Sequence, residues 1–227
     1  MKQVAARVAA WVGFPLQAPQ LATLSKYRDW LVKEAIPAGG LGPEEADRVW
    51  SRHLADSLTF AACWPRRHPP PTLLDVGSGV GLPGIPLAVL WPATSVTLLD
   101  RSGRRCELAR RAWRVLGLGN VSVVQSSADR HRSRYAMTVI RALVPPQQAV
   151  GIGARLTEPA GIVAVGLSRT ARPDGEAVRR RFLGEIAAIH PGNTVDLVSV
   201  PAAVLDSPAW LLRMTTTAST TRGQPLD

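Results

Sequence analysis

The last two thirds of the chain alternate between short apolar runs and helical stretches, and this alternation restricts the fold more than any other feature. The predicted strands are Thr72–Val76, Ser95–Leu99, Val121–Val124, Met137–Ile140, Gly161–Val165, Val195–Val200 and Trp210–Thr215. The helical patterns between them are Gly103–Leu116, Pro146–Leu156 and Gly175–Ile189. Such alternation predicts an α/β fold with a doubly wound, mostly parallel sheet. No helical pattern separates the last two strands, so we expect an antiparallel finish.

The residues before this region are typical of a helical extension. Apolar residues recur at helical spacing from Leu21 to Val32, and a second amphipathic stretch surrounds Trp50. The proline-rich run Trp64–Pro71 cannot continue a helix. We therefore expect an N-terminal helical extension over 1–70, the doubly wound domain over 71–216 and a disordered polar tail over 217–227.

A glycine-rich segment follows the first predicted strand. Its residues Gly79 to Gly84 match the pattern G-x-G-x-x-G, whose glycines let the backbone approach a ligand closely. Asp100 ends the second predicted strand, 21 residues after Gly79, where a carboxylate can accept hydrogen bonds from ribose hydroxyls. The pattern predicts a cofactor that contains adenosine, with Gly79 and Asp100 in its site.

Two prolines in this segment distinguish between such cofactors. Pro83 and Pro86 lack the backbone N–H groups that hold a pyrophosphate at a helix N-terminus. We also expect Pro86 to delay the first turn of the following helix. Because S-adenosylmethionine has no diphosphate, the loop favours this cofactor over a nicotinamide dinucleotide.

Four motifs carry a resemblance to a known family. D-V-G-S-G-V-G-L-P-G-I-P-L (Asp75–Leu87) resembles the cofactor loop of the bacterial glucose-inhibited division protein B family, and S-R-H-L-A-D-S-L (Ser51–Leu58) resembles its other distinctive motif. T-L-L-D (Thr97–Asp100) and V-I-R-A-L (Val139–Leu143) follow in the expected order. The resemblance spans Leu21 to Gly166. It implies a Rossmann-like S-adenosylmethionine-dependent methyltransferase that modifies guanine N7 in small-subunit ribosomal RNA.

The resemblance also implies residues of the cofactor site. Carried over by position, Gly77 and Leu82 contact the cofactor through the loop, and Ala128 and Asp129 lie at the adenine. Arg141, at the end of the fourth predicted strand, reaches the cofactor or the target pocket.

His53 and Arg141 are the candidate catalytic residues. His53 shares a helical stripe with Trp50, so a buried structural histidine is the alternative, and Asp56 could orient it or pair with Arg52. Guanine N7 has an available lone pair, so its methylation needs no proton removal. Alignment and electrostatics can then supply the catalysis, without a general base.

Several positions depart from the family pattern. Ala136 stands where an acid is usual, Ser127 where a basic residue is usual, and Val165 where a Lys precedes the glycine. The family's asparagine-leucine-threonine stretch is not visible in Ala38–Gly42. These departures suggest a divergent member or a paralogue with a changed substrate.

The chain is strongly basic, with 27 Lys and Arg against 17 Asp and Glu and a net charge of +10. This excess favours a polyanion such as RNA, although an arginine bias from a GC-rich coding sequence is the alternative. We expect most arginines of the helix after Asp100 to face outward, and two further basic clusters add to them. The helix carries Arg104, Arg105, Arg110, Arg111 and Arg114, and the clusters are Arg130, Arg132 and Arg134, and Arg66–Arg67. A small-molecule methyltransferase and a non-catalytic RNA-binding paralogue remain as alternatives.

Other features limit the compartment and the cofactors. Two cysteines and four histidines lack metal-ligand spacing, so we expect no metal and a reducing compartment. Arg7 interrupts the apolar N-terminus, which argues against a signal peptide, and prolines interrupt the uncharged run Val76–Leu99, which argues against a membrane span. We expect a cytoplasmic monomer.

Overall fold

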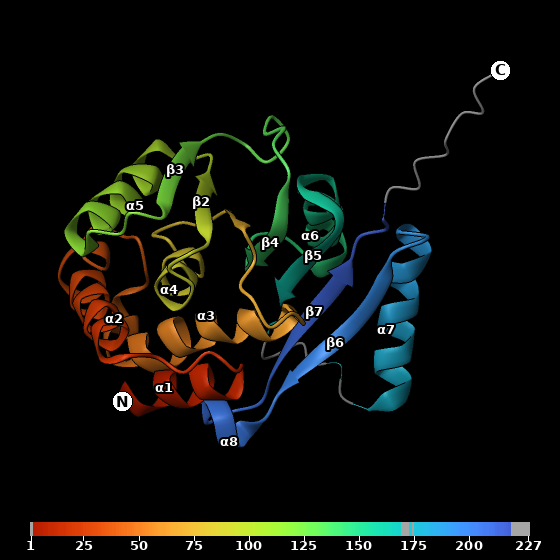
Figure 1. The fold of residues 1–227 in the computed structure, drawn as a ribbon, viewed down its shortest axis with the longest axis horizontal. Helices are drawn as coiled ribbons and strands as arrows, with labels where there is room; N and C mark the ends of the chain where they lie inside the picture. Colours follow the sequence, from red (N-terminus) through yellow and green to blue (C-terminus); the bar gives the residue numbers. More distant parts are fainter. Residues whose placement is uncertain (1, 169–172, 174, 219–227) are drawn as a thin grey trace.

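The computed structural model describes residues 2–168, 173 and 175–218. Its centre is a seven-stranded sheet of order β3-β2-β1-β4-β5-β7-β6 (Figure 1). The strands are β1 (Thr72–Val76), β2 (Ser95–Asp100), β3 (Val121–Gln125), β4 (Tyr135–Arg141), β5 (Thr157–Gly166), β6 (Thr194–Val200) and β7 (Ala209–Thr215). The strands β1 to β5 run parallel to one another, whereas β7 runs antiparallel to β5 and β6. The predicted doubly wound, mostly parallel fold and its antiparallel finish are confirmed.

The strand order reverses between β1 and β4. The chain builds outward from β1 through β2 to β3, and then returns to place β4 on the other side of β1. In that pair Val76 lies opposite Ile140. The loops that leave β1 and β4 therefore diverge from adjacent strand ends, where doubly wound sheets form their ligand crevice.

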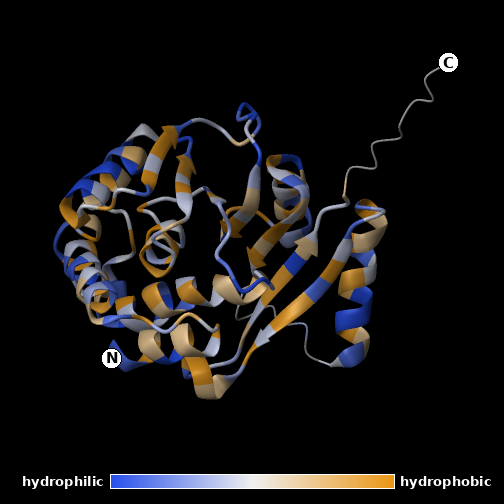
Figure 2. Cartoon of the chain, in the orientation of Figure 1, coloured by the Kyte–Doolittle hydropathy of each residue, from blue (hydrophilic) through white to orange (hydrophobic). Residues whose placement is uncertain are grey.

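Helices cover both faces of the sheet, and alternate residues of each strand face alternate layers. Leu73 of β1 packs in the layer with α1, α2, α4 and α5, whereas Leu74 packs in the layer with α6 and α7. Figure 2 shows hydrophobic residues along the strands and hydrophilic residues on outer helix surfaces. The helices are α1 (Lys2–Trp11), α2 (Ala18–Trp30), α4 (Gly84–Leu90), α5 (Gly103–Leu116), α6 (Pro146–Leu156), α7 (Glu176–Ile189) and α8 (Ala202–Leu205).

The N-terminal helical extension is confirmed, and it is more irregular than a pattern of α-helices predicts. After α2 it contains two π-helical turns and two 3₁₀ turns. These are η1 (Leu31–Ala35), η2 (Pro43–Arg48), η3 (Val49–Ala55) and η4 (Thr59–Cys63), with the short α3 (Asp56–Leu58) between the last two. The sequence analysis did not predict α1, whose buried face contacts α8 and η3. The residues that bury this face, in α8 and η3, are distant in the sequence, so the local pattern did not indicate which side of α1 is buried.

The start of α4 differs from the prediction. The helix begins at Gly84, and Pro86 lies inside its first turn rather than delaying it. The first N–H groups of an α-helix have no intrahelical acceptor, so a proline there loses no hydrogen bond. The Gly84 N–H donates instead to Asp75 Oδ2 at 2.7 Å, which gives this helix end a buried carboxyl partner.

The arginines of α5 are mostly exposed, as predicted, but two of them hold the extension. Arg104 donates to the carbonyl oxygen of Ala38, and Arg111 lies 2.5 Å from Glu34 Oε2. These contacts join α5 to the segment after α2. Exposed pairs of this kind contribute little stability individually, on the order of 1 kcal/mol or less. They nevertheless occupy two arginines that the sequence had offered for phosphate contacts.

The structure bears only in part on the predicted tail and on the expected absence of a membrane span. Of the predicted tail, residues 219–227 lie outside the described residues. Among the helices of the described part, none has the length and apolar character that crossing a membrane requires.

The contact between α6 and β5 generates a stability prediction. A β-carbon at Gly153 would lie 2.3 Å from Val163 Cγ1, whereas one at Gly151, on the same helix, would lie 3.6 Å from its nearest neighbour, His190 Cε1. We expect Gly153→Ala to lower the free energy of unfolding by about 1–3 kcal/mol through overpacking. Gly151→Ala should raise it by up to about 1 kcal/mol through helix propensity. Urea denaturation measures both, and equal shifts would contradict this packing.

Candidate active site

The glycine loop between β1 and α4 is open on its outer side. Gly77 and Gly79 have positive φ values of 72° and 59°, which a side chain would strain. A β-carbon at Gly79 would meet no atom of the described residues within 4 Å. One at Gly77 would meet Leu143 Cδ1 at 2.7 Å, the end of a flexible side chain from the loop after β4. The backbone at Gly77 and Gly79 can thus be approached closely by a ligand, whereas Leu82, the third predicted loop residue, is 4% exposed.

Asp100 fixes this loop to the end of β2. Its carboxylate is 4% exposed, and it accepts hydrogen bonds from the Gly79 N–H at 3.0 Å and from the Ser102 N–H at 2.9 Å. The structure therefore brings two predicted site residues, Gly79 and Asp100, into direct contact. Each carboxylate oxygen retains a further acceptor lone pair, which is compatible with the predicted ribose contact.

Ala128 and Asp129 lie in the turn after β3, at the same edge of the sheet. Arg155 of α6 donates to the carbonyl oxygen of Ala128 and, at 2.9 Å, to that of His131. No helix separates β3 from β4 in the described chain, so this long side chain provides support for the turn. Sequence reasoning did not identify Arg155, because it lies in the last turn of α6 and belongs to no local motif.

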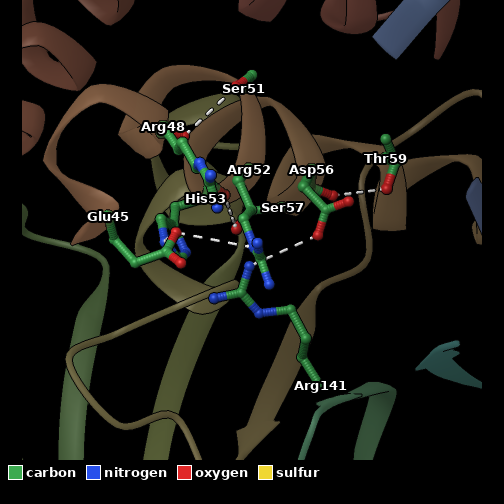
Figure 3. A network of polar contacts seen from close by, with 9 residues as sticks. All are labelled: Glu45, Arg48, Ser51, Arg52, His53, Asp56, Ser57, Thr59 and Arg141. Atoms are coloured by element: carbon green, nitrogen blue, oxygen red, sulfur yellow. Dashed lines mark hydrogen bonds and ion pairs between the residues drawn. The ribbon is translucent and has the colours of Figure 1, made fainter. Parts of the chain in front are cut away.

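The candidate catalytic residues belong to one polar network (Figure 3). Arg141 points from the end of β4 toward the extension, where its NH1 atom lies 3.6 Å from Asp56 Oδ2. His53 Nε2 lies 2.9 Å from Glu45 Oε2, and Arg52 Nε lies 3.7 Å from the same oxygen. The hydrogen-bond partner of His53 is thus Glu45, which the sequence analysis had not singled out, rather than the predicted Asp56. The turn η2 brings Glu45 back over η3.

His53 is buried and predominantly neutral at pH 7. Burial lowers its pKa below the ordinary value, the positive charge of Arg141 lowers it further, and the hydrogen bond and charge of Glu45 oppose both effects. Its Nδ1 atom has no hydrogen-bond partner among the described residues. The predicted burial on the Trp50 stripe is confirmed, and the ring adjoins the cavity that Arg141 also lines.

Buried polar atoms without partners surround the glycine loop. Asp75, next to the last residue of β1, is fully buried, and burial raises its pKa to about 7, against the opposing effects of the Gly84 N–H and of Arg141. Within the described part of the chain, Asp75 Oδ1 and Ser78 Oγ have no hydrogen-bond partner. Buried polar groups are normally paired, so these atoms fit a ligand with ammonium and hydroxyl groups. S-adenosylmethionine has both, which makes the loop chemically compatible with it.

A cavity of about 1000 Å³ opens beside the network, at the ends of β4 and β5. One side is polar and comes from the extension and β4. The other side is apolar and comes from the loop after β4, from α7 and from β7. Its lining includes Arg52, His53, Asp56, Phe60, Arg141, Val144, Pro145, Pro146, Gln147, Gly166, Val178, Phe182 and Trp210. Its volume is that of a site for a sizeable ligand.

Fold and site together define the class of protein. A glycine loop after β1, an acid that ends β2 and a cavity at the end of β4 are the features of the Rossmann-like fold of S-adenosylmethionine-dependent methyltransferases. The fold is similar to the crystal structure of magnesium protoporphyrin IX methyltransferase from Synechocystis PCC 6803 with bound S-adenosylmethionine. The TM-score is 0.56 and the identity 16%, over 86% of this chain and 97% of that one.

The sequence places the chain within this class. The GidB family model, described as rRNA small subunit methyltransferase G, matches residues 20–182, and the chain belongs to this family. The protein named ribosomal RNA small subunit methyltransferase G in Acidothermus cellulolyticus is 36% identical over 138 residues, which are 61% of each chain. That of Frankia alni is 31% identical over 216 residues, 92% of this chain and 79% of the relative. The alignment with the Acidothermus protein thus spans less than two thirds of that relative. The match to the family model confirms the resemblance to the glucose-inhibited division protein B family.

The buried carboxyl group of Asp75 predicts a specific pH dependence of stability. Its pKa is about 7 in the fold and 3.8 ordinarily, so the folded state holds a proton that the unfolded state has already released. The contribution of the Asp75 carboxyl group to the free energy of unfolding is therefore fully present below pH 3.8 and is lost as the pH rises to about 7. Asp75→Asn has no proton to lose, so it should not show this decrease in unfolding free energy, which amounts to up to about 4 kcal/mol in the parent protein. Urea denaturation at several pH values measures it.

The exposed acid Glu107 provides the control, because Glu107→Gln removes a carboxylate that is 56% accessible. The difference in unfolding free energy between Asp75→Asn and the parent protein should grow from pH 4 to pH 7.5. A difference that stays constant over this range, as expected for the Glu107 variant, would contradict the raised pKa.

Proposed function

We propose that this chain transfers a methyl group from S-adenosylmethionine to guanine N7 in small-subunit ribosomal RNA, as a cytoplasmic monomer. The observation that carries the proposal is the position of the family match. The matched residues 20–182 contain the glycine loop, Asp100 and the network of Glu45, His53 and Arg141. The part of the chain that builds the site is therefore the part that matches a family named for ribosomal RNA methylation.

The proposed cofactor site uses the loop and the two strand ends beside it. When bound, S-adenosylmethionine supplies an electrophilic methyl group. Gly77, Gly79 and Leu82 present backbone to it, and Asp100 accepts hydrogen bonds from ribose hydroxyls while it holds the Gly79 N–H. Ala128 and Asp129 border the adenine in a turn that Arg155 holds in place.

The chain's own groups orient the target base. Guanine N7 attacks with a free lone pair, so no side chain has to remove a proton, and the neutral His53 is not required as a base. Arg141 lines the cavity and is held by Asp56, so that its guanidinium can donate to guanine O6. His53 and its partner Glu45 shape the polar wall beside it. Catalysis by alignment fits this set of groups.

The departures from the family pattern lie mostly away from the cavity. Ala136 in β4 is 5% exposed and Val165 in β5 is 2% exposed, and neither lines the cavity. Substitutions inside the sheet change packing rather than recognition. This placement favours the ribosomal RNA substrate over the small-molecule alternative.

The exposed arginines after β3 are the proposed phosphate contacts. Arg130, Arg132 and Arg134 precede β4 and lie next to the turn of Ala128 and Asp129. Unlike Arg104 and Arg111 of α5, none of the three contacts the extension among the residues that the structure describes. Arginines near a cofactor site suit the phosphates of folded RNA.

Affinity for the cofactor tests the role of Asp100. Asp100→Ala removes both the ribose acceptor and the partner of Gly79, and we expect S-adenosylmethionine to bind about 10- to 100-fold more weakly, since a hydrogen bond to a charged group contributes roughly 1.5–3 kcal/mol. Isothermal titration calorimetry measures this loss. Glu107→Ala, on the exposed side of α5, should leave the affinity unchanged. Equal affinities in both variants would remove Asp100 from the site.

Labelled methyl transfer tests the function itself. The purified protein is incubated with radiolabelled S-adenosylmethionine and small ribosomal subunits that lack guanine-N7 methylation, and the modified base is mapped by cleavage at N7-methylguanine. We expect one labelled guanine in the small-subunit RNA. Arg141→Lys keeps the charge but loses the fork of donors, so the rate should fall at least about tenfold. Label that enters small molecules but no RNA would refute the proposed substrate.

A further inference from the structure

The apolar wall of the cavity contains an aromatic ring that the proposed mechanism has not used. Trp210 lies on β7 and is half-buried. The guanidinium carbon of Arg179, on α7, lies 4.3 Å from the centre of the Trp210 ring, and Arg179 Nε donates to the Pro173 carbonyl at 3.0 Å. Trp210 also lines the cavity, so the indole is held by Arg179 while part of its surface faces the space where a substrate would enter.

The sheet determines how far this ring is from Arg141. Arg141 of β4 pairs with Gly166 of β5, and Gly166 pairs with Leu211 of β7, the neighbour of Trp210. Two strand spacings of 4.7–4.9 Å separate Arg141 from Leu211 by about 10 Å along the sheet. Successive residues of a strand point to opposite faces of the sheet, so Trp210 points toward α7 whereas Arg141 points toward the extension. The two side chains therefore line one cavity from the two faces of the sheet, beyond the ends of β4 and β5. Figure 1 shows β7 directly beside β5, with α7 alongside the β6–β7 hairpin.

Methylation at N7 changes the charge of the base that occupies such a space. The N7 lone pair forms the new bond to the methyl carbon, the carbon–sulfur bond breaks with its electrons on sulfur, and no proton leaves. The positive charge of the sulfonium thus ends on the guanine ring. Aromatic faces attract cations, so a stacked indole favours the methylated base, and the transition state that leads to it, over neutral guanine.

We infer that Trp210 stacks on the target guanine and selects for its cationic, N7-methylated form; this inference rests on the proposed function. Aromatic side chains are the usual platforms for bases that are taken out of an RNA structure. Arg179 already occupies the π-system of the same ring. It keeps the preference modest, which allows the methylated product to leave. The family match ends at residue 182, so Trp210 lies in the part of the chain outside it.

Binding without cofactor tests the inference. The probes are GMP and 7-methyl-GMP, and small-subunit RNA before and after methylation; the readout is the ratio of dissociation constants within each pair. For the parent protein we expect the methylated probe to bind about three- to tenfold more tightly. Trp210→Leu should bring both ratios close to one, Trp210→Phe should retain part of the preference, and Arg179→Gln should increase it.

Controls separate stacking from damage to the fold. Trp11→Leu, on the exposed side of α1, should leave the ratios unchanged, and thermal unfolding should show that the Trp210 variants are folded. Equal affinities of the parent protein for both members of each pair, or ratios that survive in Trp210→Leu, would overturn the inference. Either result with intact methylation of ribosomal RNA would leave the proposed function standing. Failure of the parent protein to methylate any RNA would instead remove the proposed function.

Discussion

The parallel pairing of β1 with β2 on one side and β4 on the other is the constraint on which the rest of the structure depends. This backbone ladder places three strand ends at one edge. The glycine loop leaves β1, Asp100 ends β2, and Arg141 ends β4. β1 is buried on both faces, and the open backbone at Gly79 is held by the hydrogen bond from its N–H to Asp100. The chemistry of the loop is therefore a consequence of strand order.

The N-terminal extension supplies side chains to the site at this edge of the sheet. Glu45, His53 and Asp56 all come from the extension, and Asp56 meets Arg141 from the sheet. Arg111 and Glu34 connect the extension to α5 on the other side of the cofactor loop. The polar part of the cavity wall thus depends on how irregular helical turns pack on the sheet. The network and the loop share Arg141, whose charge lowers the pKa of both His53 and Asp75.

Much of the architecture could be predicted from local pattern. The ends of α5 and α6 match the prediction, and all the predicted strands are present, because buried parallel strands read as short apolar runs bounded by turns. The glycine loop could also be predicted from the sequence, since positive φ values and close ligand approach both favour glycine. Predictions failed where backbone hydrogen bonding depends on distant groups. Pro86 is tolerated in the first turn of α4, and Asp75 supplies the acceptor for the neighbouring Gly84 N–H.

The sequence by itself determined the fold class, the cofactor loop and the family, because each is encoded in residues that are close together along the chain. Only the tertiary structure decided which side chains meet. Glu45 rather than Asp56 binds His53, Arg155 supports a turn 27 residues before it, and Trp210 reaches the cavity that Arg141 lines from a strand far along the chain. These contacts have no local signature, since they arise from the packing of helices on a sheet whose strand order reverses at β1.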